Sequence, residues 1–483
     1  MKRPFIFLIL ITGVFIALRL YGFPHYSLFR GDQGLDMLTL WSMEHTQFHP
    51  LTGAPLSVPT ITVPPTFFYL MWLFYKTTGT YVGVYAGTFL LALGTFLILV
   101  RLAWKIGGAV SGLLAALLIA VSRVYIFQAI NLWDPIPGIF FLSLSLFTLY
   151  HAHKQRNMFF LWAGVCCFAC SVSLYPGPII LLPLLFWFVF WWYRNIWKAA
   201  VTIICSFLPF FIPELFAGNI RNFFSLNGLI VQSEIAGLHW IQSLSLLAQN
   251  LLVFMQAAVP ASLGIAIVAF ACLFWCTAAY LTHRNRKFPT GAVLTGFLGM
   301  PALTLYRGPA NDHRLWGYLP VMVLLAALSV PFSLRQKGPT RYVAFVFLSL
   351  YCITNISALR LYFRHPLQQF SHTERIAALI AMDMRTRRIT PTEVSYSYVR
   401  QSHMDNYELY SIWYWLEQSH GIPVPFYADG SVNTTRRTEA SAFYRICEGS
   451  CIPTMALPGT LVTAHYGVGG YSLYVLERIH QTP

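Results

Sequence analysis

Charged side chains are scarce in this chain of 483 residues, and their scarcity excludes an ordinary soluble protein. Only 10% of the residues are charged and 57% are hydrophobic, whereas a soluble domain carries about 25% charged residues. Apolar stretches recur from Phe5 to Ser357, each close to the roughly 20 residues that one helical crossing of a bilayer needs. The composition therefore predicts a mainly α, polytopic helical membrane protein.

Several motifs are also absent. Neither G-x-x-x-x-G-K-[ST] nor G-x-G-x-x-G occurs, so nothing indicates nucleotide-driven transport or a dinucleotide cofactor. No internal repeat is visible, which weighs against many transporter folds. No A-x-A-like site follows the first apolar stretch, which therefore indicates a retained span rather than a cleaved signal peptide.

Hydropathy predicts about eleven transmembrane helices within residues 1–358. A long first outer loop, about 21–80, separates the first two. The spans are expected at about 5–20, 81–100, 109–127, 135–150, 158–174, 178–193, 199–216, 258–282, 290–306, 315–333 and 341–357.

The basic residues predict the orientation. With the N-terminus in the cytoplasm, fourteen Lys and Arg residues fall on the inner side and seven on the outer side before residue 358. Basic residues favour the cytoplasmic side, so the pattern predicts a multi-pass protein of the cell membrane with an extracytoplasmic C-terminal segment. The net charge of +15 follows from this bias and does not indicate nucleic-acid binding.

The acidic residues of the membrane part are even more unevenly distributed. None of them falls in a predicted cytoplasmic loop, although acids contribute little to orientation. Solvated loop charges are one explanation, and a polar chamber at the outer face is the one we favour because ionisable groups close to a bilayer are costly. The seven carboxylates are Asp32, Asp36, Glu44, Asp134, Glu214, Glu234 and Asp312.

Residues 359–483 have the composition of a small soluble domain. They hold eleven of the 32 basic residues and ten of the 17 acidic ones, so the segment is nearly neutral. The pattern predicts helices at 372–387 and 406–420 and strands at 393–399, 461–466 and 471–477, hence an extracytoplasmic α/β domain. Cys447 and Cys451 lie here, apart from the cysteines of the predicted spans, and can close a disulfide outside the cytoplasm.

The first outer loop carries the most informative pattern. It contains Gly31-Asp32-Gln33-Gly34-Leu35-Asp36, with Asp32 suited to capping a short helix. In that helix Asp32 and Asp36 lie one turn apart on one side. The stretch 50–57, PLTGAPLS, follows, and then Pro64-Pro65 opens an apolar helix that ends near Lys76 and is too short to span. A cap and a solvated acid would explain Asp32 and Asp36 without any function.

This order of features resembles the C-type glycosyltransferase superfamily (GT-C), and within it the protein-mannosyltransferase-like and aminoarabinose-transferase-like group, also described as glycosyltransferase family 39. The resemblance covers about residues 1–358. It implies that Asp32 is the essential acidic residue of the first outer loop, and that the reaction inverts the anomeric centre. The Asp-Glu pair common in the family is absent, because Gln33 stands in the second place.

The chemistry suits an enzyme acting outside the cytoplasm, where nucleotide sugars are absent and a lipid-linked donor is needed. A carboxylate would take the acceptor's proton, for which Asp32 and Asp36 are the catalytic candidates. Arginine and lysine suit the departing lipid phosphate. A divalent metal ion at Asp32 and Asp36 is left open. Candidates for binding the lipid phosphate or the sugar are Arg30, Lys76, Arg221, Arg307, His313, Arg314, Asn131 and Asp134.

The sequence therefore predicts an integral-membrane glycosyltransferase that moves a sugar from a polyprenyl-phosphate donor to a hydroxyl of a glycan, lipid or protein acceptor. Two alternatives stay open. One is a transporter or flippase for an amphiphilic solute, although the predicted spans lack the mid-membrane carboxylates typical of that class. The other is a non-catalytic relative that binds a lipid-linked sugar, because the second acid of the family motif is missing.

Overall fold

The computed structural model divides the chain into two compact units. One comprises Met1–Tyr21, Leu51–Tyr69 and Ala86–His365, and the other comprises Gly22–Pro50, Leu70–Tyr85 and Pro366–Pro483. Most of the first outer loop therefore belongs to the same unit as the C-terminal segment. The structure describes residues 2–29, 31–46, 48–53, 63–132, 135–175, 177–216, 252–253, 255–284, 319–364, 367, 369–391, 394–400, 403–404, 409–422, 442–448, 460–468 and 471–478.

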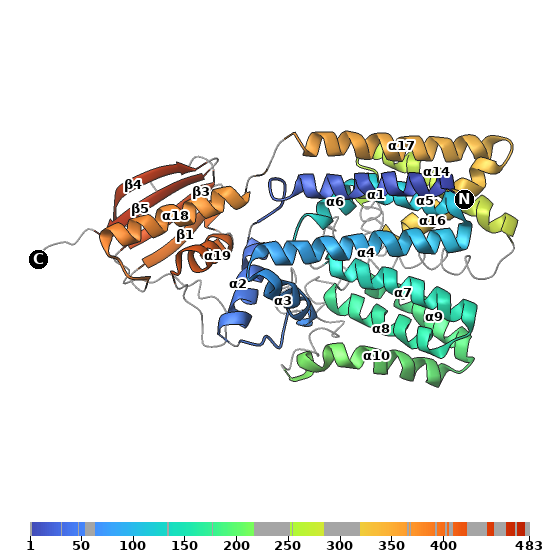
Figure 1. The fold of residues 1–483 in the computed structure, drawn as a ribbon, viewed down its shortest axis with the longest axis horizontal. Coiled ribbons are helices and arrows are strands. Elements are labelled where there is room, and N and C mark those ends of the chain that lie inside the picture. Colours follow the sequence, from blue (N-terminus) through green and yellow to red (C-terminus); the bar gives the residue numbers. More distant parts are fainter. Residues whose placement is uncertain are drawn as a thin grey trace, which may run out of the picture. The chain divides into compact units, whose positions relative to one another are not determined.

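Helices make up nearly all of the described part of the first unit (Figure 1). They are α1 (Lys2–Gly22), α4 (Tyr81–Gly107), α5 (Ala109–Val121), α6 (Arg123–Ala129), α7 (Pro135–Gln155), α8 (Met158–Leu174), the 3₁₀ turn η1 (Gly177–Leu181), α9 (Leu182–Tyr193), α10 (Ile196–Phe216), α14 (Leu263–Arg284), α16 (Leu319–Arg335) and α17 (Pro339–Tyr362).

Within the described residues, six helices are long and apolar enough to cross a membrane, and a seventh span results if α5 and α6, bent by 65°, count as one. The helices α8, α9 and α16 are apolar but shorter. The predicted span at 290–306 lies outside the described residues, and every other predicted span coincides with an apolar helix. A polytopic helical membrane protein is thus confirmed, with fewer full-length spans in its described part than the eleven predicted.

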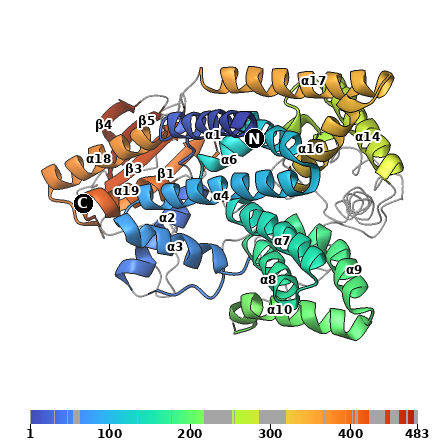
Figure 2. The ribbon, with the colours of Figure 1, turned by 45° about the vertical axis from the view of Figure 1, so that its right-hand side comes forward.

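Small residues and buried hydroxyls join α7 to α8, which lie side by side in both ribbon views (Figure 2). Ser145 donates to the carbonyl oxygen of Gly164 and Ser171 to that of Gly138, each at 2.7 Å. A Cβ on Gly138 would lie 2.8 Å from the Cβ of Tyr175. Close backbone approach and interhelical hydrogen bonds are what hold helices together inside lipid.

A buried arginine connects α1 to the bend between α5 and α6. Arg19 is 1% exposed, and its guanidinium lies 3.5 Å from the centre of the Phe15 ring. It donates to the carbonyl oxygens of Ile119 at 3.2 Å and Ala120 at 3.4 Å. These oxygens belong to the last turn of α5, where carbonyls lack partners within the helix. Arg19 thus satisfies them from the neighbouring helix.

Replacing Arg19 by methionine is expected to destabilise the protein by on the order of 2 kcal/mol, because hydrogen bonds from a charged donor are lost at a helix end. Thermal unfolding of the purified protein in detergent measures the effect. Leu20→Met is the matched control, since Leu20 is 60% exposed on the same helix. Equal stability of the two variants would contradict the role of Arg19.

The C-terminal residues of the second unit form a five-stranded sheet in the order β2-β1-β3-β5-β4. β1 and β3 are parallel, and the other neighbours are antiparallel. Three strands and both helices coincide with the predicted ones, whereas β2 and β3 were not predicted. The elements are α18 (Gln369–Arg387), β1 (Val394–Arg400), β2 (His403–Met404), α19 (Leu409–His420), β3 (Ala442–Glu448), β4 (Thr460–Val468) and β5 (Tyr471–Arg478).

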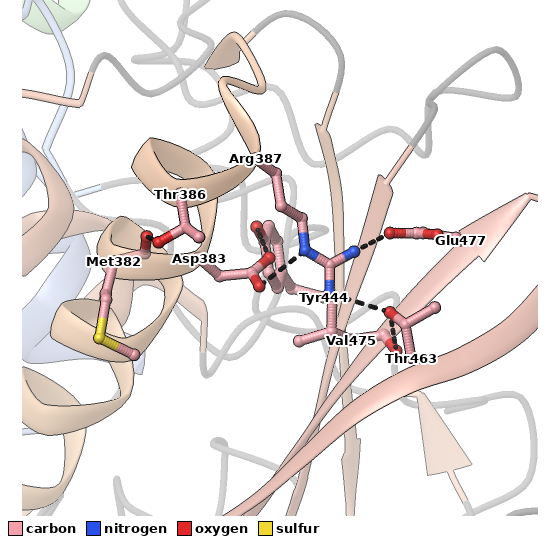
Figure 3. A network of polar contacts seen from close by, with 8 residues as sticks. All are labelled: Met382, Asp383, Thr386, Arg387, Tyr444, Thr463, Val475 and Glu477. Carbon is pink, nitrogen blue, oxygen red and sulfur yellow. Dashed lines mark hydrogen bonds and ion pairs between the residues drawn. The ribbon is translucent and has the colours of Figure 1, made fainter.

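A polar network fastens α18 to the sheet (Figure 3). The Nε of Arg387 lies 2.9 Å from the Oδ1 of Asp383, and its Nη1 pairs with Glu477 on β5. Tyr444 on β3 donates to the other oxygen of Asp383 at 2.8 Å, and Thr463 on β4 accepts from the Nη2 of Arg387 at 3.1 Å. One helix is thus tied to three strands, including the unpredicted β3.

Aromatic rings join the first outer loop to the C-terminal helices within the second unit. Phe370 of α18 stacks on Phe29 with ring centres 4.4 Å apart and also contacts Phe23 and Tyr81. Tyr414 of α19 contacts Phe29 and accepts a hydrogen bond from the backbone N–H of Tyr81 at 3.2 Å. These contacts hold the loop that carries the candidate catalytic acids against the C-terminal domain.

Candidate functional site

The helix that carries Asp32 and Asp36 is α2 (Gly31–His45). It forms where predicted and begins at Gly31, so Asp32 stands inside its first turn rather than at the capping position before it. A carboxylate in the first turn suits the positive end of the helix dipole. Asp32 is exposed, whereas Asp36, one turn later, is 7% exposed. The two acids therefore occupy different environments, and only Asp32 is open to water.

Asp32 is the described acid best suited to exchange a proton with a ligand. Although water reaches its side chain, the surrounding protein desolvates the carboxyl and raises its pKa above the ordinary 3.8. Desolvation disfavours the charged form, which is why the shift is upward. A raised carboxyl pKa combined with access to water is a combination found in general bases.

The backbone of α2 lies directly against α19. A Cβ on Gly34 would lie 2.2 Å from the backbone nitrogen of Ser411 and 2.5 Å from its Cα. Gly34 stands between the two acids, so only a glycine there lets the helix that carries them approach α19 this closely. The contact explains why a helix former as poor as glycine occupies the middle of a turn.

Lys76, a predicted phosphate ligand, lies in α3 (Thr66–Thr78), the short apolar helix expected after Pro64-Pro65. Its Nζ is 3.8 Å from the Oε2 of Glu44 and 3.8 Å from the centre of the Trp72 ring. Trp72 donates from its Nε1 to the same oxygen at 2.8 Å. The ion pair is exposed and contributes at most about 1 kcal/mol, so a stronger anion can replace Glu44.

Tyr75, in the same helix as Lys76, donates to the Oε1 of Gln418 on α19 at 3.1 Å. Burial and, to a smaller degree, the charge of Glu44 raise the pKa of Tyr75. Its hydroxyl therefore stays protonated and acts as a donor between α3 and α19. Like α2, α3 is thus held by the C-terminal domain.

Asn131 lies in the first unit, directly after α6, and is fully buried. Its Nδ2 donates to the carbonyl oxygen of Phe127 at 2.5 Å. This bond turns the amide back onto its own helix, as a terminating side chain does. Its predicted role in binding donor or sugar stays a prediction.

The remaining predicted ligands lie outside the described residues: Arg30, Asp134, Arg221, Arg307, His313 and Arg314. Cys447 is disulfide-bonded, but Cys451 is also outside the described part, so the predicted pairing stays a prediction. Among the described residues, no group of three or more His, Cys, Asp or Glu side chains could hold a metal ion. Asp32 and Asp36 as metal ligands therefore also stay a prediction.

Sequence reasoning missed the grouping of Glu44, Trp72 and Lys76. The spacing of Trp72 and Lys76, four residues apart on a helix, was sufficient to place them on one face. Glu44, 28 residues before Trp72, comes from another helix, and no local pattern indicates that pairing.

The fold and the placement of α2 define a polytopic helical membrane protein with a C-terminal sheet domain and a candidate carboxylate in the first outer loop. No protein-family model matches the chain, and no curated protein matches it in sequence.

Solved structures do match. ArnT from Cupriavidus metallidurans in the apo state is similar over 97% of both chains, with a TM-score of 0.58 and 11% identity. The same protein bound to undecaprenyl phosphate matches with a TM-score of 0.60, again at 11% identity and 97% of both chains. The zinc and sulfate complex of the oligosaccharyltransferase from Archaeoglobus fulgidus matches 85% of this chain and 61% of its own, at 14% identity and a TM-score of 0.51. The resemblance to the aminoarabinose-transferase-like group is therefore confirmed in the fold.

Proposed function

We propose that this protein is an integral-membrane glycosyltransferase that moves a sugar from a polyprenyl-phosphate donor to an acceptor hydroxyl outside the cytoplasm. The observation that carries the proposal is the similarity in fold, over 97% of both chains, to a transferase whose structure was solved with undecaprenyl phosphate. The raised pKa of the accessible Asp32, in the loop where the resemblance implies the essential acid, supports it.

In the proposed reaction, the carboxylate of Asp32 accepts the proton of the acceptor hydroxyl. The acceptor oxygen then forms a bond to the anomeric carbon, while the bond from that carbon to the phosphate oxygen breaks. Its electron pair leaves with the lipid phosphate. Because the acceptor oxygen attacks from the face opposite the phosphate, the anomeric configuration inverts. The transition state resembles an oxocarbenium ion, and cations of the outer loops, Lys76 among them, would stabilise the departing phosphate.

The test is a transfer assay on the purified full-length chain. Radiolabelled polyprenyl-phosphate sugars are incubated with an extract of cell-envelope acceptors, and the label is followed into the acceptor fraction. In parallel, vesicles that contain the protein are assayed for flux of the same lipid-linked sugars. Label transfer supports the transferase. Flux without transfer would replace it by a flippase, and tight donor binding with neither would indicate a non-catalytic relative.

The rate of transfer is expected to rise with pH through the raised pKa of Asp32. Only the deprotonated carboxylate can accept a proton, and burial moves its pKa above 3.8, so the acid limb of kcat/KM should be centred above that value. A phosphodiester donor has no second phosphate ionisation to produce such a limb. If the residual activity of Asp32→Asn showed the same acid limb, the titrating group would be a residue other than Asp32.

A further inference from the structure

A basic and aromatic surface lies at the C-terminal ends of α4, α7 and α9 in the first unit. The guanidinium of Arg156 lies 5.0 Å from the centre of the Trp191 ring, and that of Arg194 lies 5.6 Å from it. The ring of His153 lies 5.4 Å from the same ring, centre to centre, at a tilt of 37°. Arg156 and Arg194 both have positive φ, 52° and 55°, and both stand where a helix ends.

The surface continues onto α4. Arg101 and Lys105 are exposed and act electrostatically on His151 of α7. Between Glu44 and Glu214 the sequence contains a single acid, Asp134, which precedes the opposite end of α7. The cations of this surface therefore have no acidic neighbour in the described parts of α4, α7 and α9. Together we call them the basic surface: Arg101, Lys105, Lys154, Arg156 and Arg194.

An apolar cavity opens beside the basic surface. Its volume is about 190 Å³, and its walls come from α4, α7, α8, α9, α16 and η1. Leu102 and Ile106 line it next to Arg101 and Lys105, and Tyr150 lines it next to His151. The hydroxyl of Ser145 in the wall is turned away, since it donates to the carbonyl oxygen of Gly164, so the cavity offers an apolar lining.

We propose that this cavity and the basic surface form a binding site for one anionic phospholipid of the bilayer. An acyl chain would fill the cavity, and its phosphate would lie against Arg101 and Lys105. A smaller apolar cavity, of about 150 Å³, stays free of water and takes up apolar guests. Each cation near an anionic headgroup strengthens its binding by about fivefold. The site shares no residue with the candidate ligands of the donor, so its test is independent of the proposed function.

Charge and shape together favour this occupant. A zwitterionic lipid has no net charge to match five cations without acidic neighbours, and a soluble anion would leave the apolar cavity unfilled. Interfacial tryptophans and snorkelling basic residues are typical of the headgroup level of a membrane. A polyprenyl phosphate also carries a phosphate on an apolar chain. The experiment therefore compares the two lipids directly.

The test is photolabelling of the full-length protein in nanodiscs of phosphatidylcholine that contain phosphatidylglycerol with a diazirine at the end of one acyl chain. Labelled peptides are mapped by mass spectrometry. We expect labels on α7, α9 and α16, displaced by unlabelled phosphatidylglycerol. The double variant Arg101→Ala/Lys105→Ala should reduce labelling by about thirtyfold, because two headgroup cations are lost. Its matched control is Lys198→Ala/Arg341→Ala, which removes the same charge from exposed positions on α10 and α17, two helices that do not line the cavity.

Filling the cavity tests the other half of the site. Leu146→Trp on α7 and Leu325→Trp on α16 both fill the cavity from its lining. Each should abolish labelling of the cavity residues, whereas Leu144→Trp, outside the lining, should not. Thermal unfolding checks that each variant folds. Because two variants fill the cavity independently, the test still holds if one of them does not fold. Labelling that persists after filling would overturn the proposal. Equal displacement by phosphatidylcholine, or stronger displacement by a polyprenyl phosphate than by phosphatidylglycerol, would overturn it as well.

Discussion

Replacing Asp32 by asparagine is expected to lower the rate of sugar transfer by about 10²–10⁴-fold, the contribution typical of a general base. Asparagine has nearly the same shape and keeps one oxygen, but it cannot accept the proton of an acceptor hydroxyl. The loss should appear in kcat, because the base acts in the transition state rather than in binding of the donor. Steady-state kinetics with a polyprenyl-phosphate sugar measures it.

The structural role of Asp32 predicts a much smaller effect, so the two explanations separate. Its charge in the first turn of α2 contributes about 0.3–1 kcal/mol through the helix dipole, and asparagine is well accepted at helix N-termini. Thermal unfolding should therefore change little. Glu374→Gln, an exposed carboxylate on α18, is the control for loss of an acid elsewhere in the second unit. Wild-type transfer by Asp32→Asn would remove Asp32 as the base.

The membrane helices were predictable because their signal is local. A run of apolar residues interrupted by basic ones indicates a helix wherever it occurs, so α1, α4, α7 and α17 coincide with expected spans. The break between α5 and α6 was not predictable, since it depends on Ser122 as the N-cap of α6 and on Arg19 reaching the carbonyls of α5. That contact joins residues a hundred positions apart, and hydropathy carries no information about it.

The second unit was predictable only in part, for the same reason. The hairpin of β4 and β5 is rich in β-branched and aromatic residues on both sides of a Gly-rich turn, and α18 and α19 show helical periodicity. β3 escaped because Ala442–Glu448 has buried residues on both faces, Tyr444 and Arg445 included, and thus no alternation. It pairs in parallel with β1, and the paired residues are 48 positions apart in the sequence. Parallel strands are not joined by a tight turn, so no turn motif in the sequence indicates the pairing.

The candidate site shows the same division between local and distant signals. The motif around Asp32 predicted α2 and the relative position of its two acids, because i and i+4 share a helix face. The environment of Asp32 could not be predicted from the sequence, because α2 packs against α19, which lies more than 360 residues later in the chain. Grouping of residues 22–50 with 366–483 in one compact unit is a property of tertiary packing alone.

Gly34→Ala is expected to destabilise the second unit and to reduce transfer, although the same substitution in an open helix stabilises. Helix propensity alone predicts a gain of about 0.5–1 kcal/mol. Against it, the new Cβ would lie 2.2 Å from the nitrogen and 2.5 Å from the Cα of Ser411. Overpacking of this kind costs about 1–3 kcal/mol, so the contact outweighs the propensity and the sign of the change is reversed.

The sign of the stability change makes Gly34→Ala a sharper test than the magnitude of that change. Gly13 lies in the middle of α1 with nothing within 4 Å of its would-be Cβ, so Gly13→Ala should be neutral or stabilising in thermal unfolding, while Gly34→Ala lowers the melting temperature. Because the opposing atoms are backbone, removing the Ser411 side chain in Gly34→Ala/Ser411→Gly should not restore stability. Displacement of α2 would also move Asp32, two residues from Gly34, so kcat should fall while donor binding persists. A Gly34→Ala protein as stable and active as wild type would show that α2 does not need α19 to place its carboxylate.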